Sequence, residues 1–506
     1  MHDIDNKIAK GAAWMVTFKL IDRGMGLIST TVLARLLLPA DFGLVAMAMV
    51  VIAALQLLIS FSFDVPLIQN RNAGRDQFDT AWTINLSFAL LAAAVLALLA
   101  GPVALFYKEP RLELVIYLLA AGFALQGFAN IGPVTFRREM QFDREFKFLL
   151  AKRSSMLIVT IPLAFWLQNY WALVAGQLTG TAVSVLLSYM VSDYRPRLSL
   201  KAKTELFHSS KWLMINNILQ FLNGRAADFV IGRLAGARGL GFYTIASEVA
   251  LLPTTELVAP INRAAFPGYA LAAGDLEQLR SSFLKVVSTI GMFALPAGIG
   301  IVAVAPLMVP AVLGWKWEPV VPVMQILAVF GVIQAIQTNI SYVYLATGRP
   351  RIIAAIGAIQ FMVLLGFLIP GIMHWGVTGA AWAYLATAVV MIPVNQTLLA
   401  RFLQLAPLAF LQKMTRPFVA SLAMAGVIAL LRSQVDLPHE TSDYLLMLLA
   451  CIALGAITYA LTLYGLWVGA KKPSGPEQFV VVKLEAALGR LRRRLRGSDK
   501  HIDPAS

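Results

Sequence analysis

Residues 80–104 read TAWTINLSFALLAAAVLALLAGPVA and contain no charged side chain. A helix of this length can cross a bilayer, whose hydrocarbon core of about 30 Å requires roughly 20 predominantly apolar residues. The pattern recurs along the chain, because polar residues gather in short clusters between long apolar runs. The sequence therefore predicts an integral membrane protein built from spanning helices.

The composition of the 506-residue chain supports this prediction. Hydrophobic residues make up 58% of it and charged residues only 14%, whereas about a quarter of the residues of a soluble protein are charged. The formal net charge of +15 is explained by basic cytoplasmic loops, so it does not indicate nucleic-acid binding. The single cysteine, Cys451, excludes an intramolecular disulfide and a cysteine metal cluster.

About fourteen spanning helices are expected. The first is not a cleavable signal peptide, because Lys19, Asp22 and Arg23 interrupt its apolar run. Tight linkers such as Gln168–Asn169 imply that consecutive helices are antiparallel neighbours. The expected spans are residues 11–35, 42–63, 80–104, 112–132, 148–167, 170–191, 211–234, 240–262, 283–305, 319–345, 352–372, 376–398, 414–432 and 443–468.

Basic residues gather in alternate linkers, and this asymmetry orients the chain. One set of linkers includes Arg75, Arg137, Arg195 and Arg263, whereas the opposite set offers few cations. Because cytoplasmic loops are enriched in Lys and Arg, the first set is predicted to be cytoplasmic. Both termini then lie inside, which requires an even number of helices.

An internal repeat predicts two lobes of the same topology. Arg35 and Gly43 recur as Arg233 and Gly241, 198 residues later, and each glycine follows a large hydrophobic residue. Six expected helices separate the copies, so the lobes should be related by an axis along the membrane normal, as in parallel-repeat transporters. The expected domains are helices 1–6 in residues 1–200, helices 7–12 in 201–400, helices 13–14 in 401–469 and a tail in 470–506.

The tail is predicted to form a basic amphipathic helix. Leu484, Leu488, Leu491 and Leu495 fall on one helical face, with arginines around them. Such a helix suits the anionic cytoplasmic leaflet of a membrane. The alternative is a disordered, solubilising tail.

Ionisable side chains inside the expected spans are candidates for function, because they are costly in a bilayer. Helix one carries Lys19, Asp22 and Arg23, which share a face because they are three and four residues apart. Helix seven, its repeat partner, carries Arg225 and Asp228. A cavity between these helices would be net positive and would suit an anion such as phosphate. Alternatively, each carboxylate neutralises its neighbour and only fixes helix packing.

The motifs present favour transport over catalysis. The sequence contains no G-x-x-x-x-G-K-[ST] loop for ATP hydrolysis, no histidine in a metal-binding pattern and no large outer loop for a catalytic domain. We therefore expect no enzyme activity, no metal site and no cofactor, with an H+ or Na+ gradient as the energy source. Asp22, Asp228 and Glu248 are the candidates for coupling to that ion.

Several stretches together resemble a known family. They are KGA at residues 10–12, LARLLLPADFGLVAM at 33–47, VPLIQ at 65–69, DTAWTIN at 79–85 and FRREMQF at 136–142. In this order they resemble the polysaccharide-exporter branch of the multidrug/oligosaccharidyl-lipid/polysaccharide (MOP) flippase superfamily, and above all Wzx-type flippases of the colanic-acid and xanthan exporter kind. The likeness covers residues 5–470 and is strongest in the first 150.

The resemblance implies a MATE-like, V-shaped pair of six-helix lobes plus two further helices. It implies that the protein moves an undecaprenyl-diphosphate-linked oligosaccharide repeat unit from the cytoplasmic to the periplasmic leaflet of the bacterial inner membrane, for surface or exopolysaccharide biosynthesis. Family members carry cations on helices one and seven, so Lys19, Arg23 and Arg225 are assigned to the diphosphate or an acidic sugar. A polysaccharide polymerase and export machinery are the implied protein partners.

Two other functions remain as alternatives. A drug/cation antiporter of the same superfamily should have a predominantly acidic and aromatic cavity, whereas the cavity expected here holds more cations. A membrane polysaccharide polymerase or ligase belongs to a different class, and the short outer loops argue against it.

Overall fold

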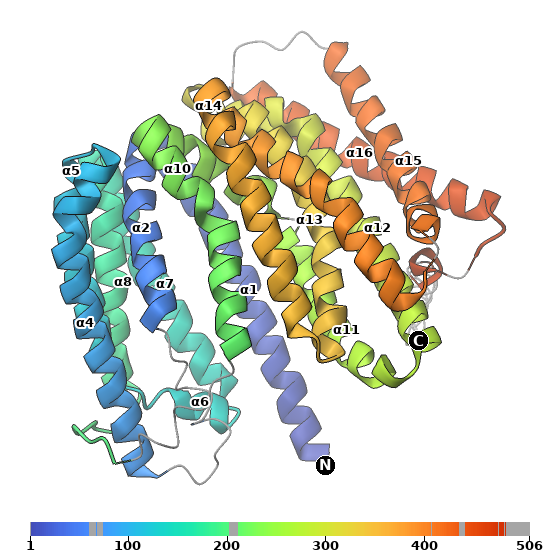
Figure 1. Ribbon diagram of the computed structural model, residues 1–506. Coiled ribbons are helices and arrows are strands. Elements are labelled where there is room, and N and C mark those ends of the chain that lie inside the picture. The colour runs from blue at the N-terminus through green and yellow to red at the C-terminus, as the bar shows by residue number, and fades with distance from the viewer. Residues whose placement is uncertain are drawn as a thin grey trace, which may run out of the picture. The chain divides into compact units, whose positions relative to one another are not determined.

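The computed structural model describes residues 2–59, 67, 74–201, 211–252, 254–405, 407–434, 441–473, 475–479 and 481. Within these residues the chain is helical and contains no strand (Figure 1). It divides into two compact units. Unit 1 consists of Met1–Ala246, Val312–Val320 and Gly357–Ala383, and unit 2 consists of Ser247–Ala311, Val321–Ile356 and Tyr384–Ser506.

Unit 1 contains seven complete α-helices from the first part of the chain. They are α1 (His2–Leu36), α2 (Pro39–Ile59), α4 (Arg75–Tyr107), α5 (Arg111–Gly127), α6 (Val134–Arg138), α7 (Phe142–Leu167) and α8 (Trp171–Met190). It also holds most of α10 (Lys211–Ala250), the 3-10 helix η4 (Trp315–Trp317) and the middle of α14 (Pro350–Leu403).

Unit 2 contains the helices of the second part of the chain and both ends of α14. They are the π-helix η1 (Thr254–Val258), α11 (Ala259–Leu271), the 3-10 helix η2 (Ala272–Gly274), α12 (Leu276–Met308), α15 (Pro407–Ser433), α16 (Thr441–Gly469) and nearly all of α13 (Val320–Ala346). A π-helical turn, η3 (Val309–Leu313), continues α12.

Two of the expected breaks between spans fall within α10 and α14, each of which consists of two helices joined at a kink. Gly236 in α10 and Gly376 in α14 adopt positive φ values of 69° and 57°, which glycine tolerates best because it lacks a Cβ atom. The two arms of α14 approach closely on either side of this kink, where a Cβ on Gly379 would lie 1.8 Å from the carbonyl oxygen of Gly371. Each kink lies at or beside a position where the hydropathy pattern placed a tight linker.

Nine helices of the described residues are long and apolar enough to cross a membrane. The 54 residues of α14 count as one helix although two expected spans lie in it. Charges interrupt α1, and α5 has only 17 residues, so neither is among the nine. The spanning character is therefore confirmed, and the count of fourteen stays a prediction.

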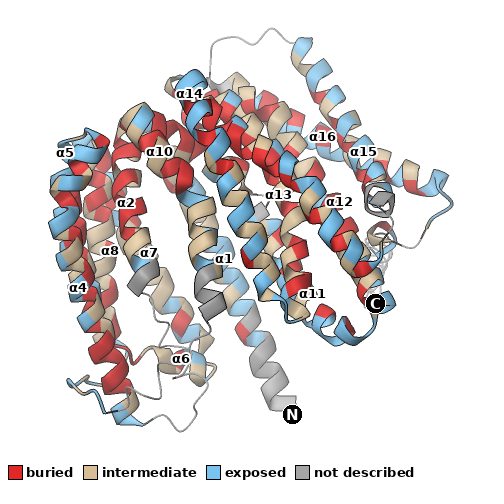
Figure 2. Cartoon of the chain, in the orientation of Figure 1, coloured by how far each residue is buried: buried red, intermediate tan, exposed pale blue. Residues whose placement is uncertain are grey.

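Large apolar side chains lie exposed on these helices. Leu105 of α4 and Trp166 of α7 are each 80% exposed, and Figure 2 shows exposed positions along α4 and α5. In water such surfaces would favour aggregation, whereas in a bilayer they contact lipid. The helices thus carry the surface of a multi-pass membrane protein.

Short turns connect antiparallel neighbours in unit 1, as the tight linkers predicted. Lys108 and Gln168 end α4 and α7 in the left-handed conformation that commonly terminates helices. The following helices start within a few residues, and α4 packs on α5 while α7 packs on α8. The helix α10 packs against the end of α4, because a Cβ on Gly232 would lie 2.6 Å from the Tyr107 ring.

Polar contacts hold the helices of unit 2 together. Arg280 of α12 caps the end of α14 by donating to the carbonyl oxygens of Leu403 and Gln404 at 2.9–3.0 Å. Arg416 of α15 lies 3.2 Å from the buried carboxylate of Glu477, which ties the segment after α16 to the unit. The tail helix predicted around residues 484–495 lies outside the described residues. The division into six-helix lobes stays a prediction.

Candidate functional site

The charged face of α1 lies against α7. Near the start of this contact the rings of Trp14 and Phe146 are 4.9 Å apart. Two turns further along, Oδ1 of Asp22 is 3.0 Å from Nε of Arg153, and both side chains are partly exposed. A Cβ on Gly26 would lie 3.3 Å from Nη2 of Arg153, so the guanidinium lies across two turns of α1.

Arg153 is a member of this site that the sequence did not single out as functional. Asp22 pairs with it across two helices rather than only with its own neighbours Lys19 and Arg23. Lys19 is exposed and Arg23 is half-buried, each with contacts of its own. One carboxylate thus shares this region with three cations, which leaves it net positive. No sequence spacing relates Asp22 to Arg153, because their proximity depends on the packing of α1 on α7.

We expect Arg153→Ala to lower the free energy of unfolding by about 1–2 kcal/mol, between the values for exposed and buried ion pairs. The loss leaves the Asp22 carboxylate without its guanidinium. The double variant Arg153→Ala/Asp22→Ala should recover most of this stability. Thermal unfolding of the purified protein in detergent measures both changes. Arg144→Ala, which removes an exposed arginine from the same helix, is the control. An Arg153→Ala variant as stable as wild type would contradict the pairing.

The second predicted pair forms on α10. Nη1 of Arg225 lies 3.0 Å from Oδ2 of Asp228, one helical turn away. The Asp228 side chain is only 9% exposed, whereas that of Arg225 is 55% exposed. The Asp228 carboxylate is therefore buried between helices, whereas part of the Arg225 guanidinium stays accessible. Arg225 and Asp228 are thus in direct contact, as their spacing on one helix predicted.

Glu248 belongs to a different compact unit from the other candidate residues. It is exposed and belongs to unit 2, whereas Lys19, Asp22, Arg23, Arg225 and Asp228 all belong to unit 1. The assignments of these residues to substrate or ion stay predictions.

Two helices cross at glycines where α2 and the second half of α10 begin. A Cβ on Gly43 would lie 1.7 Å from the carbonyl oxygen of Ala237, and a Cβ on Gly241 would lie 1.8 Å from that of Pro39. Only glycine permits such an approach, because any side chain would force the backbones apart. We call Pro39, Gly43, Ala237 and Gly241 the glycine crossing.

The glycine crossing obeys the internal repeat. Gly43 and Gly241 are 198 residues apart, and so are Pro39 and Ala237, which is the offset that relates Arg35 to Arg233. Gly43 lies against Ala237. Its counterpart in the repeat, Gly241, lies against Pro39, which is the counterpart of Ala237. A contact of this reciprocal kind is what a two-fold relation between the copies produces. The contact is arranged as the predicted repeat requires, and the repeat itself stays a prediction.

Trp317 of η4 packs against the residues next to the two glycines of the glycine crossing. Its side chain is fully buried, and its ring meets those of Phe42 and Phe242 edge to face at 5.5 and 6.0 Å. Its Nε1 donates to the carbonyl oxygen of Ala34 at 2.7 Å, and Nζ of Lys316 donates to that of Arg35 at 2.8 Å. These bonds satisfy carbonyl groups at the end of α1 that have no partner within the helix.

Comparison with protein families gives a match over residues 32–322, to the family described as polysaccharide biosynthesis protein. Among curated proteins, the chain is 27% identical to the lipopolysaccharide biosynthesis protein WzxC of Escherichia coli K12, over 84% of this chain and 86% of that protein. It is 23% identical to the succinoglycan biosynthesis transport protein ExoT of Rhizobium meliloti, over 89% and 92%.

Among solved structures, the chain is similar to the lipid II flippase MurJ in an inward closed conformation. The TM-score is 0.71 at 14% identity, and the match covers 91% of this chain and 99% of that one. This likeness shows the fold, which is the all-helical membrane fold that the sequence predicted.

Proposed function

This chain belongs to the polysaccharide biosynthesis protein family, and on that premise we propose that it flips a lipid-linked oligosaccharide across the membrane. The substrate is an undecaprenyl-diphosphate-linked repeat unit, moved from the cytoplasmic to the periplasmic leaflet of the bacterial inner membrane. The fold supports this proposal, because the similar structure is that of a lipid II flippase.

The reciprocal glycine crossing is the observation that carries the proposal. A transporter of this kind must open alternately on two sides, by movement of two repeats against each other. At the glycine crossing, α2 and α10, which belong to the two predicted repeats, meet backbone to backbone beside the Trp317 ring. With both termini in the cytoplasm, this crossing lies on the periplasmic side. It then acts as the outer gate, closed while substrate enters from inside.

The charged residues supply the binding chemistry in this proposal. Arg225 presents a guanidinium beyond its ion pair, and Lys19 and Arg23 lie on the net-positive face of α1. A guanidinium matches two oxygens of a phosphate group, so these cations suit a diphosphate. Asp228 pairs with Arg225, and Asp22 pairs with Arg153. These two acids and Glu248 are the proposed sites for coupling to H+ or Na+.

The other functions fit these observations less well. A cation antiporter gains nothing from exposed arginines at its binding site, because like charges repel. The family and the named relatives concern polysaccharide biosynthesis, and one relative is called a transport protein. We therefore propose a transporter rather than an enzyme, working beside a separate polymerase.

Deletion of the gene in a strain with no redundant exporter tests the proposed function. We expect loss of polymer from the cell surface and accumulation of the lipid-linked repeat unit. Immunoblots of surface polysaccharide and mass spectrometry of extracted lipids measure the two effects. Drug sensitivity with normal polymer would instead indicate an antiporter, and normal polymer without other change would refute both.

A further inference from the structure

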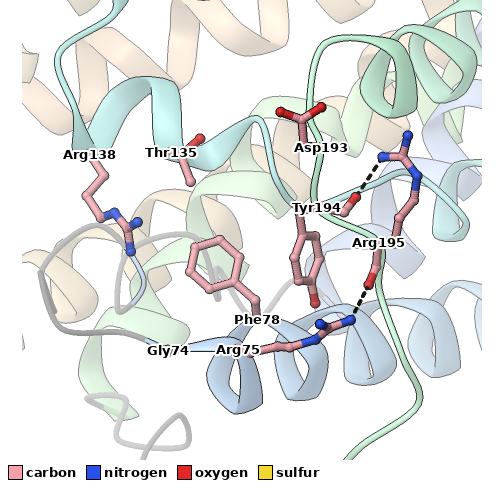
Figure 3. A pocket seen from close by; sticks show the side chains of 8 residues that line it. All are labelled: Gly74, Arg75, Phe78, Thr135, Arg138, Asp193, Tyr194 and Arg195. Atoms are coloured by element: carbon pink, nitrogen blue, oxygen red, sulfur yellow. Dashed lines mark hydrogen bonds between the residues drawn. The ribbon is translucent and has the colours of Figure 1, made fainter.

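A basic pocket lies in unit 1 and shares no lining residue with the glycine crossing or with the ion pairs described above. Its volume is about 500 Å³, which is in the range that holds a small molecule. Its lining comes from the start of α4, from α6 and from the segment after α8. The lining residues are Gly74, Arg75, Phe78, Thr135, Arg138, Asp193, Tyr194 and Arg195 (Figure 3).

Two aromatic rings form the apolar wall of this pocket. The centroids of Phe78 and Tyr194 are 5.5 Å apart, and both rings belong to a hydrophobic cluster with Trp82 and Ile131. The hydroxyl of Tyr194 donates to the carboxylate of Asp79, which also accepts from the backbone N–H of Arg197 at 2.9 Å. Burial and this hydrogen bond raise the pKa of Tyr194, so the hydroxyl remains a donor.

Three arginines surround that wall. The guanidinium of Arg138 lies over the Phe78 ring at 5.3 Å, and Nη2 of Arg75 donates to the backbone oxygen of Arg195 at 3.3 Å. Arg195 in turn donates Nη1 to the backbone oxygens of Ser192 and Tyr194 at 2.6 and 3.0 Å. These contacts hold the three guanidinium groups beside the aromatic wall. Arg75 also lies 3.6 Å from Oδ2 of Asp79, and Arg138 lies 4.0 Å from Oε1 of Glu139. Among the eight lining residues three arginines face one acid, Asp193, so the lining itself is net positive, while Asp79 and Glu139 lie beside it.

The position of the pocket limits its ligands. Arg75 begins α4, and the segment that carries Tyr194 and Arg195 follows the end of α8, and both helices are long and apolar enough to span a membrane. The pocket therefore lies at the level where lipid head groups meet water. Arginines at this level attract anionic head groups, and an adjacent aromatic wall suits the apolar atoms next to a phosphate.

We propose that this pocket binds the phosphate head group of an anionic membrane lipid, with arginine donors on the phosphate and the rings of Phe78 and Tyr194 beside its glycerol or first acyl carbons. The site holds α4, α6 and the segment after α8 together at the membrane surface. It does not depend on the substrate proposed above, because an ordinary anionic phospholipid satisfies its chemistry.

Native mass spectrometry of the full-length protein in detergent tests the proposal, because single lipid additions are resolved there without the diffuse attraction of a charged bilayer. The probes are phosphatidylglycerol, phosphatidylcholine and inorganic diphosphate. We expect phosphatidylglycerol to bind, and the variant Arg75→Gln/Arg138→Gln/Arg195→Gln to weaken that binding about 100-fold, from roughly 1 kcal/mol per arginine. The control Arg144→Gln/Lys147→Gln/Arg263→Gln removes three exposed cations outside the pocket and should change it less than about twofold.

A second variant keeps the proposal falsifiable if the triple substitution unfolds the protein. Thr135→Phe fills the pocket and leaves all three arginines, and it should also prevent phosphatidylglycerol binding. Equal affinity of the pocket variants and the control would overturn the proposal. So would equal binding of phosphatidylcholine, or competition by inorganic diphosphate at the same concentration as the lipid, which would assign the pocket to a soluble phosphate compound.

Discussion

Arg225→Ala should abolish polysaccharide export, and neutralising its partner in the same protein, by Asp228→Asn, should not restore it. Arg225 is largely exposed and Asp228 is buried, so the single substitution both removes a donor and leaves a buried carboxylate without its guanidinium. The second substitution removes only the latter problem. If Arg225 binds an anion, the double variant regains normal protein levels while export stays at least about tenfold below wild type, as expected for a lost charge-assisted contact.

The matched control is Arg233→Ala, which removes a guanidinium from the same helix two turns away, where it lies over the Phe106 ring. It should leave export within about twofold of wild type, because it perturbs a cation–π contact of a partly buried arginine. Arg23→Ala on α1 should behave like the double variant. The amounts of surface polymer and of the protein, measured in the same cells, distinguish a substrate-binding role of Arg225 from a structural one. Recovery of export by Arg225→Ala/Asp228→Asn would show that Arg225 only neutralises Asp228.

Gly43→Leu should hold the outer gate open and stop export. A Cβ at this position would lie 1.7 Å from the carbonyl oxygen of Ala237, so α2 and α10 must separate by more than an ångström to admit it. Because the crossing is reciprocal, Gly241→Leu should have the same effect. Ala237→Cys reports the change, since residue 237 is buried at the crossing.

The measurement is labelling of Ala237→Cys by a membrane-impermeant maleimide applied from outside, in a Cys451→Ala background. We expect slow labelling in the otherwise wild-type protein and at least about tenfold faster labelling with Gly43→Leu, because the buried thiol becomes accessible. Gly366→Leu, at a helical glycine of unit 1 with open space beside it, is the control and should change neither labelling nor export. Fast labelling without any substitution at Gly43 would contradict a closed outer gate.

The hydropathy pattern predicted the helices well, because a bilayer imposes a minimum apolar length on every span. It placed linkers near Gly236 and Gly376, where the structure has sharp kinks with positive φ. A kink and a short loop look alike in sequence, since both are marked by glycine between apolar runs. The repeat can also be recognised in the sequence, because Arg35 and Arg233 have the same offset of 198 residues as Gly43 and Gly241.

The contacts between helices were less predictable. Arg225 and Asp228 are one turn apart on one helix, so their spacing alone predicted the pair. Asp22 and Arg153 lie on different helices, and only the packing of α1 on α7 brings them together. The basic pocket combines three separate segments, and in the sequence Arg75 and Arg195 indicate only the orientation of the chain. Trp317 likewise had no sequence signal that linked it to Ala34.

Labelling of the lipid-linked repeat unit from outside the cell tests the proposed flipping most directly. In spheroplasts depleted of this protein, an impermeant reagent that oxidises and tags sugars should label a much smaller fraction of the extracted lipid-linked oligosaccharide, while the total amount rises. Re-expression of wild type should restore the fraction, and the Gly43→Leu variant should not. A labelled fraction unchanged by depletion would contradict the account, because the repeat unit would then cross the membrane without this protein.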